Sequence, residues 1–288
     1  MKPYALVVGE SLVDVVLEPD GSRTERPGGS AANVAVALAR LDRPVRFATA
    51  FADDERGRAI AMHLARDGVE LATDAYAVAR TSTAEATIGA DGSASYAFDL
   101  DWRLNPLGEE RPLFVHVCSI GAVLEPGADD VLAILDRIEG ATVSYDINAR
   151  PAITGTGPEL VARVERVVAA AHLVKASDED LAALYPALTV DQAVQHLLEL
   201  GPRAVAVTLG GEGATWRDAD GVVEVTAPQV DVADTIGAGD TFSAAIIDAL
   251  WEQPDRAPAE VLAHAVRAAA VTVSRPGADP PYRRELVE

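Results

Sequence analysis

The chain has 288 residues, of which 49% are hydrophobic, and its 45 acidic and 24 basic side chains give a formal net charge of −21. This length suits one large α/β domain with a deep core, or two small domains. The negative charge repels nucleic acid and anionic membranes, so we expect neither as a partner. A single cysteine, Cys118, excludes a disulfide framework and fits a reducing compartment. No stretch approaches the roughly 18 apolar residues of a membrane span, and the expected location is cytoplasmic.

The N-terminal residues 4–8 have the pattern of a buried strand, which ends at Gly9, Glu10 and Ser11. A second apolar stretch, LVDVVLE, follows and contains Asp14 between two valines. Such an acid is either the outward residue of an alternating strand or a group that serves a ligand. The local pattern leaves both interpretations open.

Residues 27–41, PGGSAANVAVALARL, place two glycines before an amphipathic helix. Asn33 falls in the first helical turn, where its amide can point into a cleft together with the backbone amides of Gly28 and Gly29. The alternative is an ordinary helix start with Ser30 as its cap.

Between residues 81 and 104 polar and apolar residues alternate around Asp91-Gly92, which predicts a β-hairpin. A hairpin inserted into an α/β sequence is a candidate lid. Three aromatic side chains share one face at a period of two and either cover a ligand or pack on the core, core packing being favoured: Tyr96, Phe98 and Trp102.

After Pro112 strands and helices alternate, which favours a parallel sheet with ligands at the carboxyl ends of its strands. The expected strands are 113–118, 141–145, one near 173, and 202–208; the expected helices are about 127–138 and 157–171. Polar residues lie just past three strand ends: Ser119, Asp146 and Lys175. Ser177 and Asp180 have the spacing of a capping box, and the turn 210–213, GGEG, lets a ligand approach the backbone.

The segment 234–250, DTIGAGDTFSAAIIDAL, runs a small-residue turn into an apolar helix that we expect to begin at about Asp240. Gly237, Ala238 and Gly239 allow several N–H groups to aim at one point, and the helix adds the positive end of its dipole. This favours a phosphate or oxyanion site. Asp240 at the mouth of such a site fits a general base for a substrate hydroxyl; the alternative is that it only caps the helix.

DTIGAGDTF resembles the C-terminal signature of the PfkB, or ribokinase-like, sugar kinase family, and PGGSAAN resembles its N-terminal signature. The resemblance covers nearly the whole chain. It implies an α/β fold of the ribokinase-like type, with a mostly parallel central sheet between helices, in one domain over residues 1–288. It also implies a small lid from strands at about 10–20 and 81–104. The segments GESLVD, 96–104 and DINARP are most similar to fructokinase-type members, which phosphorylate fructose to fructose 6-phosphate with ATP.

The resemblance also implies roles for individual residues. In the catalytic group, Asp240 acts as general base and the amides of Gly237, Ala238 and Gly239 form the anion hole. The implied sugar-binding residues are Asp14, Gly28, Gly29, Asn33, Tyr96, Phe98 and Arg150, and the implied ATP-binding residues are Lys175, Ser177, Thr208, Gly210 and Gly213. Asp180 is implied to organise Mg2+ through water, and Asp234 and Thr235 are implied to help hold a K+ ion. Ser177 and Asp180 replace the family's usual Asn-x-x-Glu, which keeps the charge and leaves the geometry open.

Several alternatives remain at this stage. A ribokinase, a 2-keto-3-deoxygluconate kinase or a nucleoside kinase fits the same motifs, because one hydroxyl changes pocket preference without changing them. A catalytically silent sugar or nucleotide sensor is the alternative of another class, although a binder has no use for a base at Asp240. The lid strands predict a homodimer.

Overall fold

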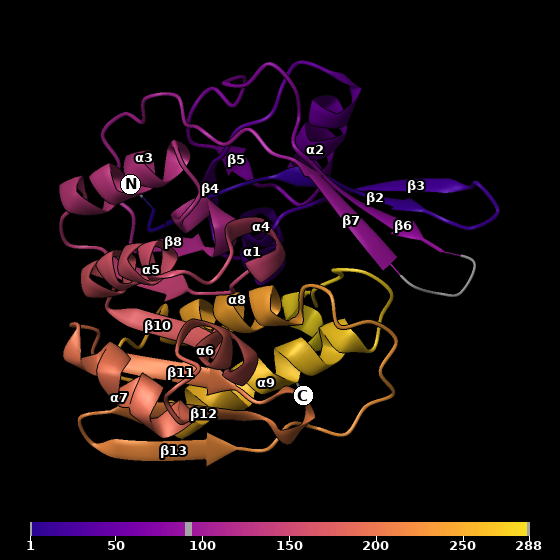
Figure 1. Cartoon of the computed structure of the whole chain (residues 1–288). Coiled ribbons are helices and arrows are strands. Elements are labelled where there is room, and N and C mark those ends of the chain that lie inside the picture. The colour runs from indigo at the N-terminus through magenta and orange to yellow at the C-terminus, as the bar shows by residue number, and fades with distance from the viewer. Residues whose placement is uncertain (1, 90–93, 287–288) are drawn as a thin grey trace.

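The computed structural model describes residues 2–89 and 94–286, and within these ranges the larger sheet has nine strands in the order β13-β12-β11-β10-β9-β8-β1-β4-β5 (Figure 1). All neighbours from β5 to β11 are parallel, while β12 and β13 add an antiparallel edge. The strands are β1 Ala5–Val8, β4 Val45–Ala48, β5 Glu70–Leu71, β8 Phe114–Cys118, β9 Thr142–Asp146, β10 Leu173–Ser177, β11 Ala204–Thr208, β12 Ala214–Asp218 and β13 Gly221–Val225. The predicted mostly parallel sheet is confirmed.

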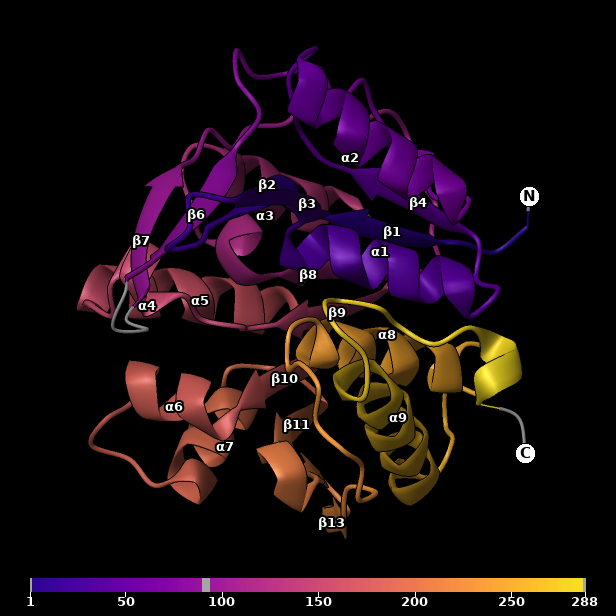
Figure 2. The ribbon, with the colours of Figure 1, turned by 90° about the vertical axis from the view of Figure 1, so that its right-hand side faces the viewer.

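Helices cover both faces of this sheet and make three layers (Figure 2). One face carries α1 Ser30–Arg40, α2 Glu55–Arg66, α8 Ala238–Leu250 and α9 Pro258–Val273; the other carries α3 Gly127–Arg137, α5 Pro158–Ala170, α6 Asp178–Leu184 and α7 Val190–Glu199. The apolar runs of the strands explain this arrangement, because successive side chains point to opposite faces. In β1, Val7 packs into the core on the α1 and α8 face, whereas Leu6 and Val8 pack into the core on the other.

A smaller sheet stands off the main body and projects to the right in Figure 1. Its order is β3-β2-β6-β7, and it is formed by β2 Leu12–Leu17, β3 Arg23–Gly28, β6 Thr83–Ile88 and β7 Ala94–Asp99. The pairing of β6 with β7 is antiparallel and confirms the predicted hairpin strands; the predicted turn at Asp91-Gly92 lies outside the described residues. The sequence did not predict β3, because RTERPG is polar and ends in Pro-Gly. Five of its six residues are exposed or half-buried.

The preference for core packing of the three aromatics is right for one and wrong for two. Trp102 is 3% exposed, and its indole N–H donates to the Gly121 carbonyl at 2.9 Å. Tyr96 is 65% exposed and stacks on half-buried Phe98, with ring centroids 6.4 Å apart. Both belong to β7, the edge strand of the small sheet, and their rings line an open cavity instead of packing on the core. Among the described residues, no helix is both long and apolar enough to cross a membrane.

Candidate active site

The carboxyl end of the parallel sheet is where the small sheet, α1 and α8 come together, and there they enclose a cavity of about 560 Å³. We call it the Asp240 cavity. Its polar lining comes from segments far apart in the sequence: Glu10, Asp14, Ser30, Asn33, Asn148, Arg150, Thr235 and Asp240. The rings of Tyr96 and Phe98 close it on the side of the small sheet. A concave site with a few convergent polar groups is the usual form of a small-molecule site.

A second cavity of about 400 Å³, which we call the α9 cavity, lies on the other side of the 234–239 turn. Helix α9 supplies Val266, Ala269, Ala270 and Val273, and the segment 227–232 supplies most of the remaining apolar lining. The strand ends supply Ser177, Thr208, Gly210 and Gly213. Thr235 and Gly239 line both cavities, so the two sites meet at this turn.

Asp240 lies in the first turn of α8 and is 5% exposed. Its Oδ1 accepts a hydrogen bond from the Ser30 hydroxyl at 2.6 Å, and its Oδ2 accepts one from the Asn33 amide at 2.8 Å. The Asn148 amide lies 3.3 Å from Oδ1 and donates to the Ser30 hydroxyl at 2.9 Å. The carboxylate is therefore held in one orientation at the edge of the Asp240 cavity.

The loop after β9 is held in place by α6. Asn148 has a φ of 38°, a left-handed conformation that asparagine tolerates better than most residues. The next residue, Ala149, donates its N–H to Asp180 Oδ1 at 2.8 Å, while Asp180 Oδ2 accepts from the Ser177 N–H at 2.8 Å. The predicted capping box at Ser177 and Asp180 is confirmed. Both carboxylate oxygens of Asp180 thus bind backbone, and the residue positions the loop that carries Asn148.

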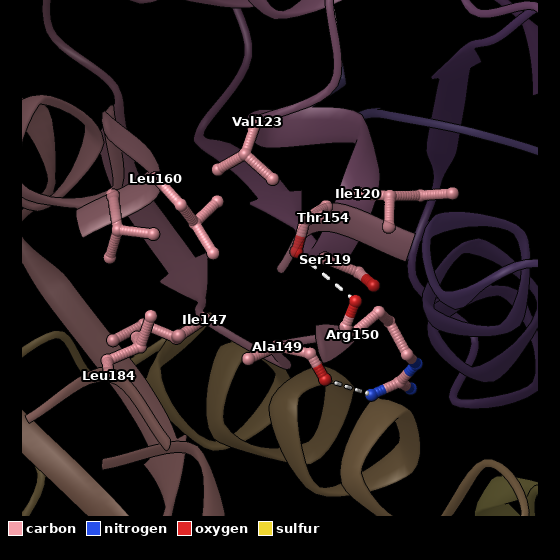
Figure 3. A pocket seen from close by; sticks show the side chains of 10 residues that line it. Ser119, Ile120, Val123, Ile147, Ala149, Arg150, Thr154, Leu160 and Leu184 are labelled. Carbon is pink, nitrogen blue, oxygen red and sulfur yellow. Dashed lines mark hydrogen bonds between the residues drawn. The ribbon is translucent and has the colours of Figure 1, made fainter. Parts of the chain in front are cut away.

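Arg150 lies where this loop turns into the short helix α4 Pro151–Thr154. Figure 3 shows the back of the loop, where Val123, Ile147, Leu160 and Leu184 surround a small pocket of about 10 Å³. The Arg150 guanidinium points away from these apolar side chains and donates to the Ala149 carbonyl at 2.9 Å, and Thr154 donates to the Arg150 carbonyl at 3.2 Å (Figure 3). The loop therefore packs apolar side chains on one side and places the Arg150 guanidinium on the wall of the Asp240 cavity.

Glu10 follows β1 and is 4% exposed. Its Oε1 accepts from the Ser30 N–H at 3.1 Å and its Oε2 accepts from the Gly121 N–H at 2.9 Å. Burial raises the pKa of Glu10 to about 7, although the backbone hydrogen bonds oppose the shift and the charge of Asp240 adds to it. Glu10 thus ties the start of α1 to the 119–122 turn beside the cavity.

Asp14 points from β2 into the Asp240 cavity, as the outward residue of its strand. Solvent reaches the side chain inside the cavity, but the surrounding walls displace much of the bulk water. This desolvation raises the pKa of Asp14 to about 6; Arg150 opposes the shift and Asp240 reinforces it. A Cβ at Gly28 would lie 2.2 Å from Asp14 Oδ2, so the glycine gives the carboxylate its room.

The 237–239 turn, which the sequence predicts as an anion hole, is tight on both of its faces. Gly237 has a φ of 76° and a Cβ there would lie 2.6 Å from the Ala278 Cβ, so glycine is required. Helix α8 begins at Ala238, two residues earlier than expected. A Cβ on Gly239 would lie 2.9 Å from Lys175 Nζ. The buried ammonium of Lys175 therefore lies directly behind the turn.

Lys175 is 6% exposed and its Nζ pairs with Asp146 Oδ2 at 3.1 Å. Asp146 Oδ2 also accepts from the Ser243 hydroxyl at 3.0 Å. Burial alone lowers the pKa of Lys175, but the charges of Asp146 and Asp180 outweigh it, so the pKa is raised and the side chain is a cation. Neither Lys175 nor Asp146 lines either cavity.

Asp234 connects the turn to the C-terminal loop. Its Oδ1 accepts from the Ile236 N–H at 3.0 Å and its Oδ2 accepts from the Gly277 N–H at 2.8 Å. These backbone hydrogen bonds lower the pKa of Asp234. Asp234 therefore joins the turn at Ile236 to the C-terminal loop at Gly277. The sequence predicted a K+ ion beside these two loops.

Most of the predicted site residues gather around the two cavities. The Asp240 cavity receives Asp14, Gly29, Asn33, Tyr96, Phe98, Arg150, Gly237, Gly239 and Asp240, and the α9 cavity receives Ser177, Thr208, Gly210, Gly213, Thr235 and Ala238. The remaining predicted residues lie behind these linings and support them: Gly28, Lys175, Asp180 and Asp234.

The sequence did not reveal the roles of two residues. Ser30 binds Asp240 through its hydroxyl, and Glu10 holds Ser30 through its backbone N–H. The N-cap of α1 is Gly29 and no side chain caps it, so the interpretation of Ser30 as a helix cap is wrong. The Ser30 hydroxyl is used by Asp240 instead. For Glu10 a signal existed, since it follows the first buried strand at the end where ligands bind.

In the described part of the chain, the side chains alone do not form a metal site. Among residues 2–89 and 94–286, no group of three or more His, Cys, Asp or Glu residues is arranged to hold a metal ion. Asp178 and Glu179 line the α9 cavity from the first turn of α6. This suits a divalent ion of the kind that takes one or two carboxylates and completes its shell with phosphate oxygens and water.

Comparison with known proteins matches residues 2–284 to the pfkB family carbohydrate kinase model. A fructokinase of Rhizobium leguminosarum bv. trifolii is 34% identical over 260 residues, which cover 85% of this chain and 79% of that protein. An aminoimidazole riboside kinase of Salmonella typhimurium is 31% identical over 285 residues, covering 92% and 88%. Among solved structures, the fructokinase of Vibrio cholerae O395 with bound fructose, ADP and calcium superposes with a TM-score of 0.84 at 28% identity, covering 96% of this chain and 94% of that one.

Proposed function

The chain belongs to the pfkB family of carbohydrate kinases, and we propose that it transfers the γ-phosphate of ATP to the primary hydroxyl of D-fructose, giving fructose 6-phosphate. The observation that carries this proposal is the meeting of the two cavities at Thr235 and Gly239, with Asp240 beside them. Fructose in the Asp240 cavity and ATP in the α9 cavity would bring the reacting hydroxyl and the phosphate to the same turn.

In the proposed step the hydroxyl oxygen of the sugar attacks the γ-phosphorus, an oxygen–phosphorus bond forms, and the bond to the β-phosphate oxygen breaks to release ADP. Asp240 accepts the hydroxyl proton. The amides of Gly237, Ala238 and Gly239 lie at the start of α8 and stabilise charge on the moving phosphoryl group. Such a reaction depends on positioning and electrostatics more than on covalent help.

Further side chains around the two cavities fit this assignment. Arg150 is a cation on the wall of the Asp240 cavity, where it can neutralise the transferring phosphate. The Lys175 ammonium lies behind Gly239 and adds positive charge without contacting either cavity. Asp14 and Asn33 face the sugar as acceptor and donor, and Tyr96 and Phe98 cover its apolar face.

Mg2+ is the divalent ion we propose, and it would neutralise the phosphate oxygens of ATP. The phosphates and water would supply most of its ligands, with the acidic start of α6 nearby. Asp180, predicted to act through water, would contribute through the loop it holds. A K+ ion beside Thr235 and Asp234 remains a proposal; the backbone hydrogen bonds of Asp234 bring together the two loops that would surround it.

Fructose is preferred as the acceptor because fructokinases are among the relatives that match most of the chain. Aminoimidazole riboside is the second candidate, since a kinase of that nucleoside is 31% identical over most of both chains. Ribose and 2-keto-3-deoxygluconate kinase activities share the same motifs. A catalytically silent sensor is disfavoured because both oxygens of Asp240 are held by hydrogen bonds beside the anion-hole turn.

We also propose a homodimer formed through the small sheet. Strand β7 is an edge strand, and its Tyr96 leaves 65% of its surface exposed, which suits pairing with a second copy of the same sheet. Light scattering that gives the mass of a monomer in the presence of sugar would exclude this arrangement.

The decisive experiment is a coupled ADP-release assay with ATP and Mg2+ on fructose, ribose, 2-keto-3-deoxygluconate, aminoimidazole riboside, adenosine and fructose 6-phosphate. Turnover on fructose supports the proposal. Asp240→Asn should lose at least the roughly 10²–10⁴-fold of a missing general base. Preference for another acceptor would overturn fructose but keep the kinase, and binding of sugar or ATP without turnover on any acceptor would favour the sensor.

A further inference from the structure

The hydroxyl of Ser30 makes the shortest hydrogen bond that Asp240 receives, at 2.6 Å from Oδ1. Ser30 is 7% exposed and is the first residue of α1. The side-chain nitrogen of Asn148 can only donate a hydrogen bond. Its 2.9 Å contact therefore uses the Ser30 oxygen as an acceptor. The single hydroxyl proton is then free for a different neighbour.

Two neighbours compete for that proton. Cys118 Sγ lies 3.2 Å from the Ser30 oxygen, in the buried interior. The thiol sulfur is a weak acceptor, whereas a carboxylate oxygen at 2.6 Å accepts a short, charge-assisted hydrogen bond. The proton therefore points to Asp240.

The position of Ser30 is fixed from behind by Glu10. The start of α1 has no side-chain cap of its own, and the Ser30 N–H is satisfied by Glu10 Oε1 at 3.1 Å. Since Glu10 Oε2 is simultaneously held by the Gly121 N–H at 2.9 Å, the carboxylate cannot rotate without losing a buried hydrogen bond. Glu10 takes over the capping task, which leaves the Ser30 hydroxyl available to Asp240.

We propose that Ser30, held by Glu10, is a positioning residue that orients the Asp240 carboxylate. The inference rests on the proposed function of Asp240 as the base. Oδ1 is bound by Ser30 and lies close to Asn148, whereas Oδ2 has, among the described residues, the Asn33 amide as its one partner and keeps a lone pair for the sugar hydroxyl. Ser30 therefore determines which oxygen acts and in which direction it points.

The test is the split between kcat and KM in Ser30→Ala. Without the hydroxyl, the Asp240 carboxylate loses its shortest hydrogen bond and can turn away from the reacting hydroxyl. Misorientation of the base should lower kcat by about 10- to 100-fold, while KM for ATP stays unchanged. Ser30→Thr keeps the hydroxyl and should restore most of kcat.

The other groups around Asp240 must remain intact in the comparison: Glu10, Asp14, Cys118, Asp146, Arg150 and Lys175. Ser82→Ala is the matched control. It removes a hydroxyl of similar burial, 6% exposed, which donates to the Asp101 carbonyl at 3.1 Å and lines neither cavity. Its kcat should equal that of the unaltered protein.

If Ser30→Ala is poorly folded, Ser30→Gly serves as the second variant, because it also removes the hydroxyl and leaves both backbone hydrogen bonds of Glu10 in place. The same fall in kcat is expected. A Ser30→Ala protein whose kcat is reduced only by the fraction unfolded in urea titration would overturn the inference. Full activity of Asp240→Asn would instead overturn the proposed base itself.

Discussion

The two cavities that meet at Gly239 are lined by different kinds of residue. The Asp240 cavity is lined by three carboxyl groups and a guanidinium, those of Glu10, Asp14, Asp240 and Arg150, and hydrogen bonds to buried partners fix Glu10 and Asp240. The α9 cavity is lined mainly by small and apolar residues of α9, the 227–232 segment and the GGEG turn. The first cavity therefore offers directed polar side chains to a ligand, whereas the second offers shape and accessible backbone.

This difference indicates how each site should fail. In the Asp240 cavity the loss of a single polar group leaves a partner or a ligand atom unpaired, which is costly in a desolvated site. In the α9 cavity few single side chains are indispensable, so adding volume should do more harm than removing it. The turn that both cavities share should be the most sensitive position of all.

The largest of these effects is expected at that turn. Gly239→Ala places a methyl group 2.9 Å from Lys175 Nζ, and this ammonium is buried and held by its pairing with Asp146. The resulting shift of the Gly239 peptide, which we propose as part of the anion hole, should lower kcat by about 10²-fold, the scale of a lost oxyanion donor. Because alanine favours helix over glycine by about 1 kcal/mol, the unfolding midpoint in urea should not fall. Steady-state kinetics and urea titration together check both parts.

Gly108→Ala is the control for this substitution. Gly108 has no positive φ, and a Cβ there would meet nothing within 4 Å. It also lines neither the Asp240 cavity nor the α9 cavity. Equal activity of Gly239→Ala and Gly108→Ala would show that the turn does not act on the phosphoryl group, and the distinction between the cavities would lose its common point.

A smaller effect, confined to one cavity, is expected for Asp14→Asn. Losing a charged acceptor should raise KM for the sugar by about 10- to 100-fold, with KM for ATP unchanged. The pKa of Asp14 is raised to about 6, so in the unaltered protein the carboxyl becomes protonated as pH falls through 6, and KM for the sugar should rise there. Initial rates from pH 5 to 8 should show this rise in the unaltered protein and a flat profile in Asp14→Asn. Equal increases in KM for the sugar and KM for ATP would show that the effect of Asp14 is not confined to the Asp240 cavity.

The sequence predicts the framework and the glycine turns from local patterns, whereas the roles of most cavity residues come from the family resemblance. Strands β8, β9 and β10 follow from apolar runs, and the glycine turns follow from the need for close backbone approach at Gly237. The capping box at Ser177 and Asp180 is also local. Such features are decided within a few residues of the chain.

The missed features all depend on contacts between distant segments. Whether the Ser30 hydroxyl caps its own helix or binds Asp240 is decided by Glu10, twenty residues earlier, and by α8, at the other end of the chain. The exposure of Tyr96 follows from the position of β7 at a sheet edge. Likewise, Lys175 has the strand-end position of a ligand residue, but its pairing with Asp146 keeps it behind the turn. Local pattern cannot choose between such partners.

The smallest effect is expected in the α9 cavity. Ala269→Leu adds volume to a wall that is already half-buried, and overpacking of about 1–3 kcal/mol corresponds to an increase of KM for ATP of roughly tenfold. Neither KM for the sugar nor kcat at saturating ATP should change, because the polar groups around Asp240 are untouched. Ala263→Leu is the control, since Ala263 is half-buried on the same helix but lines neither cavity. If Ala269→Leu raised KM for the sugar instead, the α9 cavity would not be the nucleotide site, and the two cavities would have to exchange their assignments.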